Sequence, residues 1–447
     1  MENKAYANRF KHVTVLGAAG KMGSGILLLT ALEMAALKRD PENQSADFTL
    51  YAMDISEKGL QGVMEYLKKQ SQKIGEKKLD KVKALYAGEP GIEKDEEIVA
   101  RYVEDVMSFV KPTTSIESAY DSTLVFEAVS EDQSLKVKLL SDIAKNNTND
   151  PWFLTNTSSI PIHELNAMAG LKGRTLGFHF YNPPAIQKLV EVIVGKETIP
   201  ELAAFADQLV QRLAKVKVPA NDKAGFIGNG HFMRDALFGI ELAEKLTIEY
   251  SFARAVYLIN TVTQKFLVRP MGIFQLIDYV GVDVVQLILK VMNPHFPSEK
   301  LHSTLINELY NEGVKGGQNP DGSQKNGFLQ YEEWKITGFY EPGEKKYLPL
   351  EEIKPDLDAI LGDMPEGMEP WKNLVRDPEK ENKFSGIFKN MRNMDTLGAR
   401  LAMDYGLRSK QIGLQLVEDG VAASEKDVNT VLLTGFFHAY GPINNFF

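Results

Sequence analysis

Leu176-Gly177-Phe178-His179-Phe180 and Leu189-Val190-Glu191-Val192-Ile193-Val194 are two apolar runs around which the rest of the chain can be interpreted. Such runs, bounded by turn residues, predict two short buried strands. One run carries His179 and the other Glu191. A buried carboxylate is costly unless it is paired, and His179 is the nearest candidate partner in the sequence. A carboxylate bound to one imidazole nitrogen leaves the other to act as a general base, as the oxidation of a hydroxyl group requires.

An alternative remains open for this pair: a satisfied core histidine beside an unrelated glutamate on an edge strand. The residues just before the histidine run add polar groups to the same region. Trp152 to Thr155 predicts a strand, and Asn156-Thr157-Ser158-Ser159-Ile160-Pro161 follows it directly. Ser158 is a candidate site residue here, although its position before a proline also fits the start of a helix.

The amino-terminal region carries a glycine-rich turn. His12 to Leu16 predicts a strand, and Gly17-Ala18-Ala19-Gly20-Lys21-Met22-Gly23 leads from it into a long helical stretch. Glycines at such a turn let the backbone approach a pyrophosphate, which the amino terminus of the helix stabilises. The spacing of Gly17, Gly20 and Gly23 is one residue longer than the usual G-x-G-x-x-G, and a glycine-rich turn without a ligand is the alternative.

A second strand, Phe48 to Met53, ends at Asp54. An acid at this position can accept hydrogen bonds from the ribose hydroxyls of adenosine, and it would repel a 2′-phosphate. The pattern therefore favours NAD over NADP. Further along, Leu124 to Val129 predicts another buried strand that leads to Glu131 and Lys136. Strands alternating with helices, with polar residues at the strand ends, are typical of a doubly wound α/β sheet.

The composition limits the class of protein. The chain has 447 residues, a net charge of −9 and no cysteine. The negative charge argues against a general role on nucleic acid or on membrane surfaces. The lack of cysteine excludes disulfides, thiolate metal sites and cysteine nucleophiles, and no metal site is expected. No apolar run approaches the roughly 20 residues of a membrane span. With no visible secretory signal, the expected location is the cytoplasm.

Several motifs, taken in order, resemble those of the L-3-hydroxyacyl-CoA dehydrogenase family over roughly residues 10 to 290. They are Gly20-Lys21-Met22-Gly23-Ser24-Gly25-Ile26, Phe126-Glu127-Ala128-Val129-Ser130-Glu131, Asn156-Thr157-Ser158-Ser159, His179-Phe180-Tyr181-Asn182-Pro183, Leu189-Val190-Glu191-Val192-Ile193, Gly225-Phe226-Ile227-Gly228-Asn229, Met271-Gly272-Ile273-Phe274 and Leu276-Ile277-Asp278-Tyr279-Val280-Gly281-Val282-Asp283. The order of the motifs is more specific than any one of them.

The resemblance implies a role for each candidate residue. His179 would take the proton of the 3-hydroxyl group, Glu191 would orient the imidazole, and Ser158 and Asn229 would bind the reacting substrate oxygen. Lys68 would lie near the helices that contact CoA. The positions that match the cofactor site of the family are Gly17, Gly20, Lys21, Met22, Gly23, Asp54, Glu131, Lys136, Asn156 and Asn182. The expected ligands are NAD and an acyl-CoA.

Alternatives and departures accompany this interpretation. Asn229 can be a buried structural amide, Asn182 a turn residue before proline, and Lys68 a solvated helix lysine. Besides the longer glycine turn, three positions differ from the residues usual in the family: Ala224 replaces proline, Gly230 replaces arginine and Ile273 replaces proline. The resemblance therefore does not determine the preferred acyl chain length.

The expected fold is a Rossmann-type NAD-binding domain followed by an all-α domain that is doubled. The predicted segments are residues 1–219 for the NAD-binding domain, 220–300 for the first helical copy, 301–383 for an irregular insertion and 384–447 for the second copy. The insertion is inferred from the glycine, proline and charge of residues 319–383. The doubling rests on a faint repeat that aligns Asn260-Thr261-Val262 and Gly272 with Asn429-Thr430-Val431 and Gly441.

Short members of the family carry one helical copy and dimerise through it. A second copy that covers this surface would favour a monomer over a homodimer. Two rival functions remain: a β-hydroxyacid dehydrogenase that uses a free acid, and an NAD-binding relative without turnover. Dependence on CoA distinguishes the first from the expected activity. The presence of Ser158, His179, Glu191 and Asn229 together argues against the second.

Overall fold

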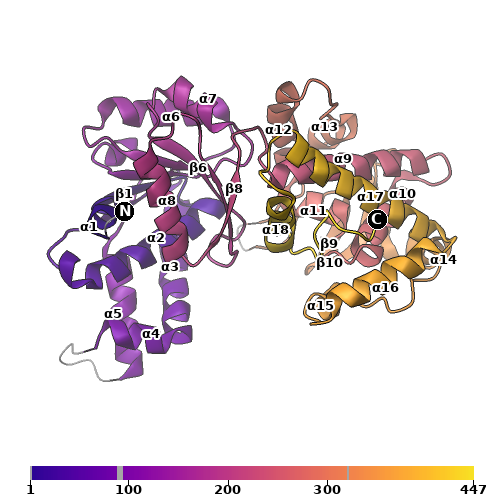
Figure 1. Cartoon of the computed structure of the whole chain (residues 1–447), viewed down its shortest axis with the longest axis horizontal. Coiled ribbons are helices and arrows are strands. Elements are labelled where there is room, and N and C mark those ends of the chain that lie inside the picture. Colours follow the sequence, from indigo (N-terminus) through magenta and orange to yellow (C-terminus); the bar gives the residue numbers. More distant parts are fainter. Residues whose placement is uncertain (1–2, 88–93, 320–321) are drawn as a thin grey trace. The chain divides into compact units, whose positions relative to one another are not determined.

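The computed structural model describes residues 3–87, 94–319 and 322–447. The chain divides into two compact units, Met1–Asp222 and Lys223–Phe447 (Figure 1). Each unit has a hydrophobic core of its own. Domains typically pack their sheets and helices around one hydrophobic core each.

The first unit is built on an eight-stranded sheet in the order β3-β2-β1-β4-β5-β6-β7-β8. The neighbouring strands are parallel except for β6 and β7, which are antiparallel. The strands are β1 (His12–Leu16), β2 (Thr49–Met53), β3 (Val110–Thr113), β4 (Leu124–Glu127), β5 (Trp152–Thr155), β6 (Thr175–Phe180), β7 (Leu189–Ile193) and β8 (Val216–Ala220). The strand order reverses between β1 and β4, and dinucleotides bind at such a point in open α/β sheets.

Helices connect the strands and cover both faces of this sheet. They are α1 (Asn3–Asn8), α2 (Lys21–Arg39), α3 (Glu57–Lys77), α4 (Leu79–Leu85), α5 (Asp95–Ser108), α6 (Gln133–Asn146), α7 (Ile162–Ala169) and α8 (Pro200–Arg212), with the 3-10 turns η1 (Pro41–Asn43) and η2 (Ile116–Ala119). Alternate strand residues enter different cores: Leu124 and Phe126 pack on one face, and Val125 packs on the other. The central strands are therefore apolar on both faces.

The second unit is mainly helical. Its helices are α9 (Gly228–Leu246), α10 (Phe252–Thr261), α11 (Ile273–Val280), α12 (Val282–Met292), α13 (Thr304–Asn311), α14 (Leu350–Leu361), α15 (Trp371–Leu374), α16 (Lys380–Arg392), α17 (Leu397–Glu418) and α18 (Glu425–Gly435), with the π-helical η3 (Val262–Phe266) and the 3-10 turn η4 (Asn293–His295). The prediction of a Rossmann-type unit followed by a helical unit is confirmed.

The segment 301–383 contains regular elements, so the prediction of an irregular insertion was wrong for these parts. It contains α13 to α15 and an antiparallel sheet of β9 (Leu329–Glu332), β10 (Lys335–Glu341) and β11 (Lys346–Pro349). The buried Asp278 carboxylate accepts hydrogen bonds from the backbone N–H groups of Phe328 and Leu329, at 2.7 and 2.8 Å. This long-range contact ties the start of β9 to α11. The predicted divisions after residues 300 and 383 remain predictions.

The alignment that pairs Asn260 with Asn429 also pairs the first residues of α9 and α17, Gly228 and Leu397. The two asparagines make similar contacts. Asn260 Oδ1 accepts from the backbone N–H of Gln275 at 3.0 Å, and Asn429 Oδ1 accepts from that of Ile443 at 3.0 Å.

The aligned glycines also lie against these asparagines. A Cβ atom on Gly272 would lie 2.2 Å from Asn260 Oδ1, and one on Gly441 would lie 2.3 Å from Asn429 Cγ. A side chain at either glycine would displace its asparagine. Both halves of the repeat therefore share one local arrangement.

The helices α9 and α17 pack against each other through buried polar contacts. The Tyr405 hydroxyl donates to the backbone carbonyl of Asp235 at 2.7 Å, and Arg269 Nη1 donates to its carboxylate at 2.6 Å. All three side chains are buried. Polar groups that are fully paired in this way fix the register of one helix on another.

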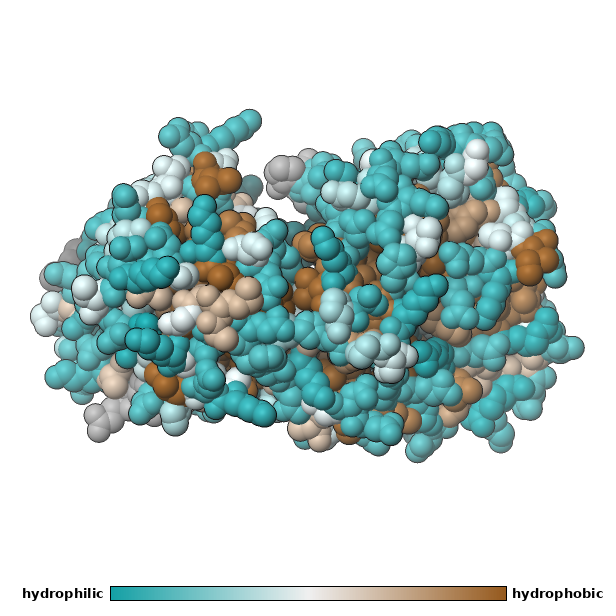
Figure 2. Space-filling model, turned by 90° about the horizontal axis from the view of Figure 1, so that it is seen from above, coloured by the Kyte–Doolittle hydropathy of each residue, from teal (hydrophilic) through white to brown (hydrophobic). Residues whose placement is uncertain are grey.

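The face of the protein in Figure 2 is mostly hydrophilic, with scattered apolar side chains. Exposed apolar residues such as Ile55 and Ile248 are separated in the sequence. Within residues 3–87, 94–319 and 322–447, no helix is long and apolar enough to cross a membrane.

Candidate active site

The glycine-rich turn joins β1 to α2 at the point where the strand order reverses. Gly17 has a φ of +75°, and a Cβ atom there would lie 2.6 Å from the carbonyl oxygen of Ala128, just after β4. A Cβ atom on Gly23 would lie 2.0 Å from the carbonyl oxygen of Gly17. Gly20 is the N-cap of α2, and Lys21 and Met22 begin its first turn. The backbone is thus closely packed beside a helix amino terminus, which is the geometry that binds a pyrophosphate.

Asp54 lies against this turn. Its Oδ2 atom accepts a hydrogen bond from the backbone N–H of Ala19 at 3.0 Å, and Oδ1 accepts from that of Ser56 at 3.1 Å. The structure therefore brings the acid at the end of β2 next to the turn after β1. Two features far apart in the sequence meet at one edge of the sheet because the carboxyl ends of parallel strands lie together.

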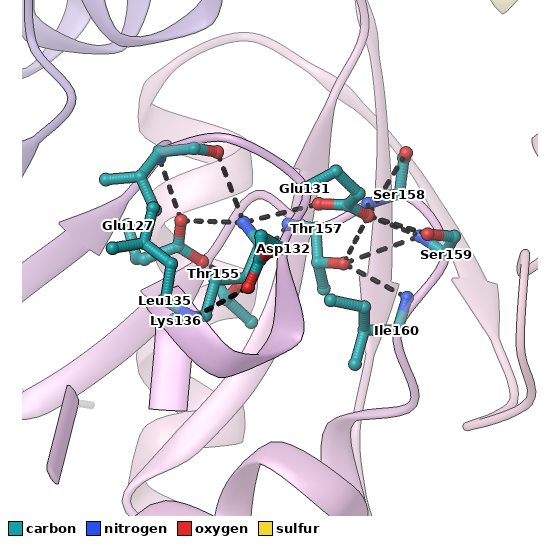
Figure 3. Close-up of polar contacts among 11 residues, drawn as sticks. Glu127, Glu131, Asp132, Leu135, Lys136, Thr155, Thr157, Ser158, Ser159 and Ile160 are labelled. Atoms are coloured by element: carbon teal, nitrogen blue, oxygen red, sulfur yellow. Dashed lines mark hydrogen bonds and ion pairs between the residues drawn. The ribbon is translucent and has the colours of Figure 1, made fainter. Parts of the chain in front are cut away.

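A buried ion-pair network joins β4 to α6 (Figure 3). Lys136 Nζ lies 2.7 Å from Glu127 Oε1 and 3.2 Å from Glu131 Oε2, and it donates to the carbonyl oxygen of Val129 at 3.3 Å. The side chains of Lys136 and Glu127 are 1% and 0% exposed. Burial alone would lower the pKa of Lys136, but the two carboxylates outweigh it and raise the pKa. The lysine is therefore charged and engaged inside the protein.

Glu131 holds the residues that follow β5. Its Oε1 atom accepts from Thr157 Oγ1 at 2.6 Å and from the backbone N–H groups of Ser158 and Ser159 at 2.8 and 3.0 Å (Figure 3). Burial alone would raise the pKa of Glu131, but Lys136 and these hydrogen bonds outweigh it and lower the pKa. An ionised Glu131 thus fixes the backbone of Ser158.

Sequence reasoning missed Thr155, Thr157 and Ser159 as parts of this network. Thr155 Oγ1 donates to Glu127 Oε2 at 2.6 Å, and Ser159 Oγ donates to Glu131 Oε1 at 2.8 Å. The signal that could have found them is the run of hydroxyl residues directly after a buried strand, opposite two acids in the preceding strand and loop.

His179 and Glu191 lie directly opposite each other on the antiparallel strands β6 and β7. His179 Nδ1 is 2.9 Å from Glu191 Oε2. The His179 side chain is 10% exposed, and that of Glu191 is fully buried. An ionised carboxylate can only accept a hydrogen bond, so Nδ1 carries the proton and Nε2 is the nitrogen that can receive another. The two residues are thus in contact, and Glu191 is not on an edge strand, because β7 lies between β6 and β8. The role of the pair as a base stays a prediction.

Neighbouring polar residues complete this part of the site. The Tyr181 hydroxyl donates to the same Glu191 oxygen at 2.9 Å, a contact that sequence reasoning missed. Asn156 Oδ1 accepts from the backbone N–H of Phe180 at 2.9 Å, so it ties the end of β5 to β6. Asn182 is half-buried and precedes a cis peptide bond to Pro183. The ends of β4, β5 and β6 thus carry the predicted residues Glu131, Asn156, Ser158 and His179.

The remaining candidates belong to other elements. Asn229 is half-buried in the first turn of α9, in the second unit. Lys68 is exposed on α3, where it lines a cavity of about 480 Å³ with Val99 and Val103 of α5. In the part of the chain that the structure describes, no group of three or more His, Asp or Glu side chains could hold a metal ion.

Comparison with known protein families gives two matches along the chain. Residues 12–223 match the NAD-binding domain of 3-hydroxyacyl-CoA dehydrogenase. Residues 253–326 match the C-terminal domain of the same enzyme. The first match spans the strands from β1 to β8, with the glycine turn and the His179–Glu191 pair. The second lies within the helical unit.

Individual proteins with similar sequences include a probable 3-hydroxybutyryl-CoA dehydrogenase of Bacillus subtilis, 27% identical over 323 residues, which are 72% of this chain and 98% of that protein. A fatty acid oxidation complex subunit alpha of Shewanella frigidimarina is 29% identical over 337 residues, which are 73% of this chain and 40% of that protein.

The fold is also found in a solved structure. The crystal structure of 3-hydroxybutyryl-CoA dehydrogenase from Escherichia coli K12 matches 97% of this chain and 90% of its own, with a TM-score of 0.62 and 20% identity. This likeness shows a shared fold. With both family models matched in order along one chain, the protein belongs to the 3-hydroxyacyl-CoA dehydrogenase family of NAD-dependent oxidoreductases.

Proposed function

We propose that the protein interconverts L-3-hydroxyacyl-CoA and 3-oxoacyl-CoA, with His179 as the general base and Glu191 as its partner. The observation that carries this proposal is the buried contact of 2.9 Å between His179 Nδ1 and Glu191 Oε2. In the oxidation direction, His179 Nε2 takes the proton of the 3-hydroxyl group, and Glu191 stabilises the imidazolium that forms. A positioned base contributes about 10²–10⁴-fold to the rate of such a reaction.

NAD supplies the hydride acceptor when it is bound. The packed turn at Gly17, Gly20 and Gly23, with the first helical residues Lys21 and Met22, fits a pyrophosphate because a Cβ atom would collide with the backbone there. Asp54 lies beside this turn, where it would accept hydrogen bonds from ribose hydroxyls and disfavour a 2′-phosphate. Asn156 and Asn182 complete the proposed cofactor surface at the strand ends.

Substrate binding is proposed for three residues. Ser158 and Asn229 would donate hydrogen bonds to the reacting oxygen, where negative charge develops. The contacts of Glu131 with the backbone of Ser158 and Ser159 support a defined position for Ser158. We therefore propose that Glu131 and Lys136, which resemble cofactor-site positions, also shape the substrate side. Lys68 would attract a phosphate of CoA through its exposed charge.

An acyl-CoA substrate is supported by the Bacillus subtilis relative, which is named as a probable 3-hydroxybutyryl-CoA dehydrogenase. A role in fatty acid oxidation is supported by the Shewanella frigidimarina relative, which is named as a subunit of the fatty acid oxidation complex. We propose a role in fatty acid oxidation or in related acyl-CoA metabolism, with a cytoplasmic location.

The test follows NADH consumption with acetoacetyl-CoA, beside acetoacetate and NADPH, for the wild type and His179→Gln. We expect turnover that requires both CoA and NADH, and a loss of about 10²-fold or more in His179→Gln with NADH binding retained. The control is His295→Gln, an exposed histidine of the helical unit, which should leave the rate unchanged. Activity retained in His179→Gln would contradict the base assignment, and equal rates with acetoacetate would contradict the substrate class.

We also propose that residues 384–447 are a second copy of the helical module and that the protein is a monomer. The matched starts of α9 and α17 and the shared arrangement of Asn260 with Gly272 and of Asn429 with Gly441 support this duplication. Because α17 packs on α9, it would occupy the surface through which a single-copy chain would pair with its partner.

A further inference from the structure

The Tyr181 hydroxyl and the His179 imidazole share one acceptor atom. Tyr181 donates to Glu191 Oε2 at 2.9 Å, and His179 Nδ1 donates to the same oxygen at 2.9 Å. Tyr181 lies just after β6, two residues beyond His179. Their rings are adjacent, with centroids 4.8 Å apart. The base–carboxylate pair is therefore a three-residue cluster.

The surroundings of this cluster favour the protonated form of the Tyr181 hydroxyl group, which can donate a hydrogen bond. Tyr181 is 9% exposed and Glu191 is fully buried. Burial, followed by the negative charge of Glu191, raises the pKa of Tyr181 well above its usual value of 10. Burial and this charge thus favour the protonated hydroxyl group, which is the form that donates a hydrogen bond. The hydrogen bond therefore runs from the Tyr181 hydroxyl to Glu191 Oε2.

We propose that Tyr181 is a positioning residue whose hydrogen bond reduces the stabilisation that Glu191 gives to the protonated imidazole of His179. This inference rests on the proposed role of His179 as the base. A carboxylate oxygen that accepts two hydrogen bonds shares its negative charge between two donors. The imidazolium is then stabilised less than by a carboxylate with one donor. The His179 imidazole, once it has taken the proton of the substrate, can therefore release this proton at a lower pH and act as a base again.

The test is the pH dependence of the reaction in both directions for the wild type and Tyr181→Phe. Without the second donor, Glu191 should stabilise the imidazolium more strongly. The pH of half-maximal rate should therefore rise by about 0.5–1 unit for both the oxidation and the reduction. At a fixed pH below this midpoint, such a shift lowers the oxidation rate roughly 3–10-fold. The plateau kcat and the KM for acyl-CoA should change little. A general loss of structure would lower both rates without moving the pH profile.

Two further variants separate the proposal from a structural effect. Tyr86→Phe removes a comparable hydrogen bond, from the Tyr86 hydroxyl to Asp105 Oδ2 at 2.8 Å, and should leave the profile unchanged. Combining Tyr181→Phe with Glu191→Gln should give no further shift relative to Glu191→Gln alone, because the shared carboxylate is gone. Replacing Tyr181 by 3-fluorotyrosine, which keeps the ring and is a stronger donor, should shift the profile to lower pH.

An unchanged half-maximal pH in both Tyr181→Phe and the fluorotyrosine protein would overturn the proposal, as would a shift that persists in the Glu191→Gln background. If Tyr181→Phe does not fold, the fluorotyrosine protein alone decides. Failure of the underlying function has a different signature, because His179→Gln would then remain active. A profile that stays fixed while His179→Gln is inactive refutes the role of Tyr181 and leaves the base assignment intact.

Discussion

The Lys136 side chain is only 1% exposed, and its positive charge is paired with the carboxylates of Glu127 and Glu131. The same lysine influences the proposed site through Glu131, whose carboxylate holds the backbone N–H of Ser158. Removing one member of a buried ion pair leaves an uncompensated charge. A single lysine therefore links the stability of the fold to the position of a candidate substrate residue.

We expect Lys136→Met to destabilise the first unit by about 3–5 kcal/mol, because the buried Glu127 and the partly buried Glu131 would lose their cation. The pKa of Glu131 is lowered in the folded protein, so its stabilisation is present above its unfolded pKa and is lost as the pH falls through its folded pKa. Urea unfolding at pH 7 measures the loss. Lys138→Met, on the same helix but exposed, is the control and should change stability by less than about 0.5 kcal/mol. Equal midpoints for the two variants would refute the expectation.

The turn between β1 and α2 shows how an element depends on its neighbours. Its sequence spacing is one residue longer than usual, yet Gly23 still packs onto the carbonyl of Gly17 and Gly17 onto that of Ala128. These contacts leave no room for a side chain at either position. The turn is therefore a close-packed backbone layer between β1, β4 and α2.

Gly23→Ala should weaken NADH binding by about 10-fold or more, because its Cβ atom would push the turn away from the helix amino terminus. Fluorescence titration with NADH measures the affinity. The matched control is Gly62→Ala on α3, where a Cβ atom meets nothing within 4 Å. This control should keep the affinity and gain about 0.5–1 kcal/mol of stability, since alanine favours the helix. An unchanged affinity in Gly23→Ala would contradict the proposed pyrophosphate site.

At the scale of the whole molecule, the second unit contains a sheet that its local sequence did not predict and a helix pair that the repeat suggested. Tyr405 of α17 donates to the backbone carbonyl of Asp235 in α9. Arg269, which follows η3, bridges the two helices through Asp235 and Ser409. If α17 takes the place of a partner subunit, the surface of α9 that would bind this partner is already covered within the same chain. Association of a second copy would then have no such surface to use.

We expect sedimentation velocity to show a particle with the mass of one chain, unchanged over about a 100-fold range of protein concentration, because α17 already covers α9. A stable dimer in which no cross-link between the two chains involves α9 or α17 would contradict the expected monomer. It would mean that the chains associate through another interface. A dimer whose cross-links run through α9 would refute the proposal that the second copy replaces a partner.

The sequence by itself determined the features that depend on local pattern. Buried apolar runs predicted the strands, glycine spacing and Asp54 predicted a dinucleotide site, and His179 and Glu191 marked two strands as unusual. These inferences succeed because strand burial and turn geometry are set by neighbouring residues. The same local pattern misjudged residues 301–383, since its glycine and charge gave no sign of the anchor at Asp278.

Only the tertiary structure decided which distant groups meet. The register of β6 on β7 places His179 opposite Glu191, and a shift of one residue would have put them on opposite faces. The same register brings Tyr181 onto the shared oxygen, and the parallel neighbours β4 and β5 bring Glu131 to Ser158. Such contacts depend on strand order and register, which are set by the packing of the whole sheet and not by the residues on either side in the chain.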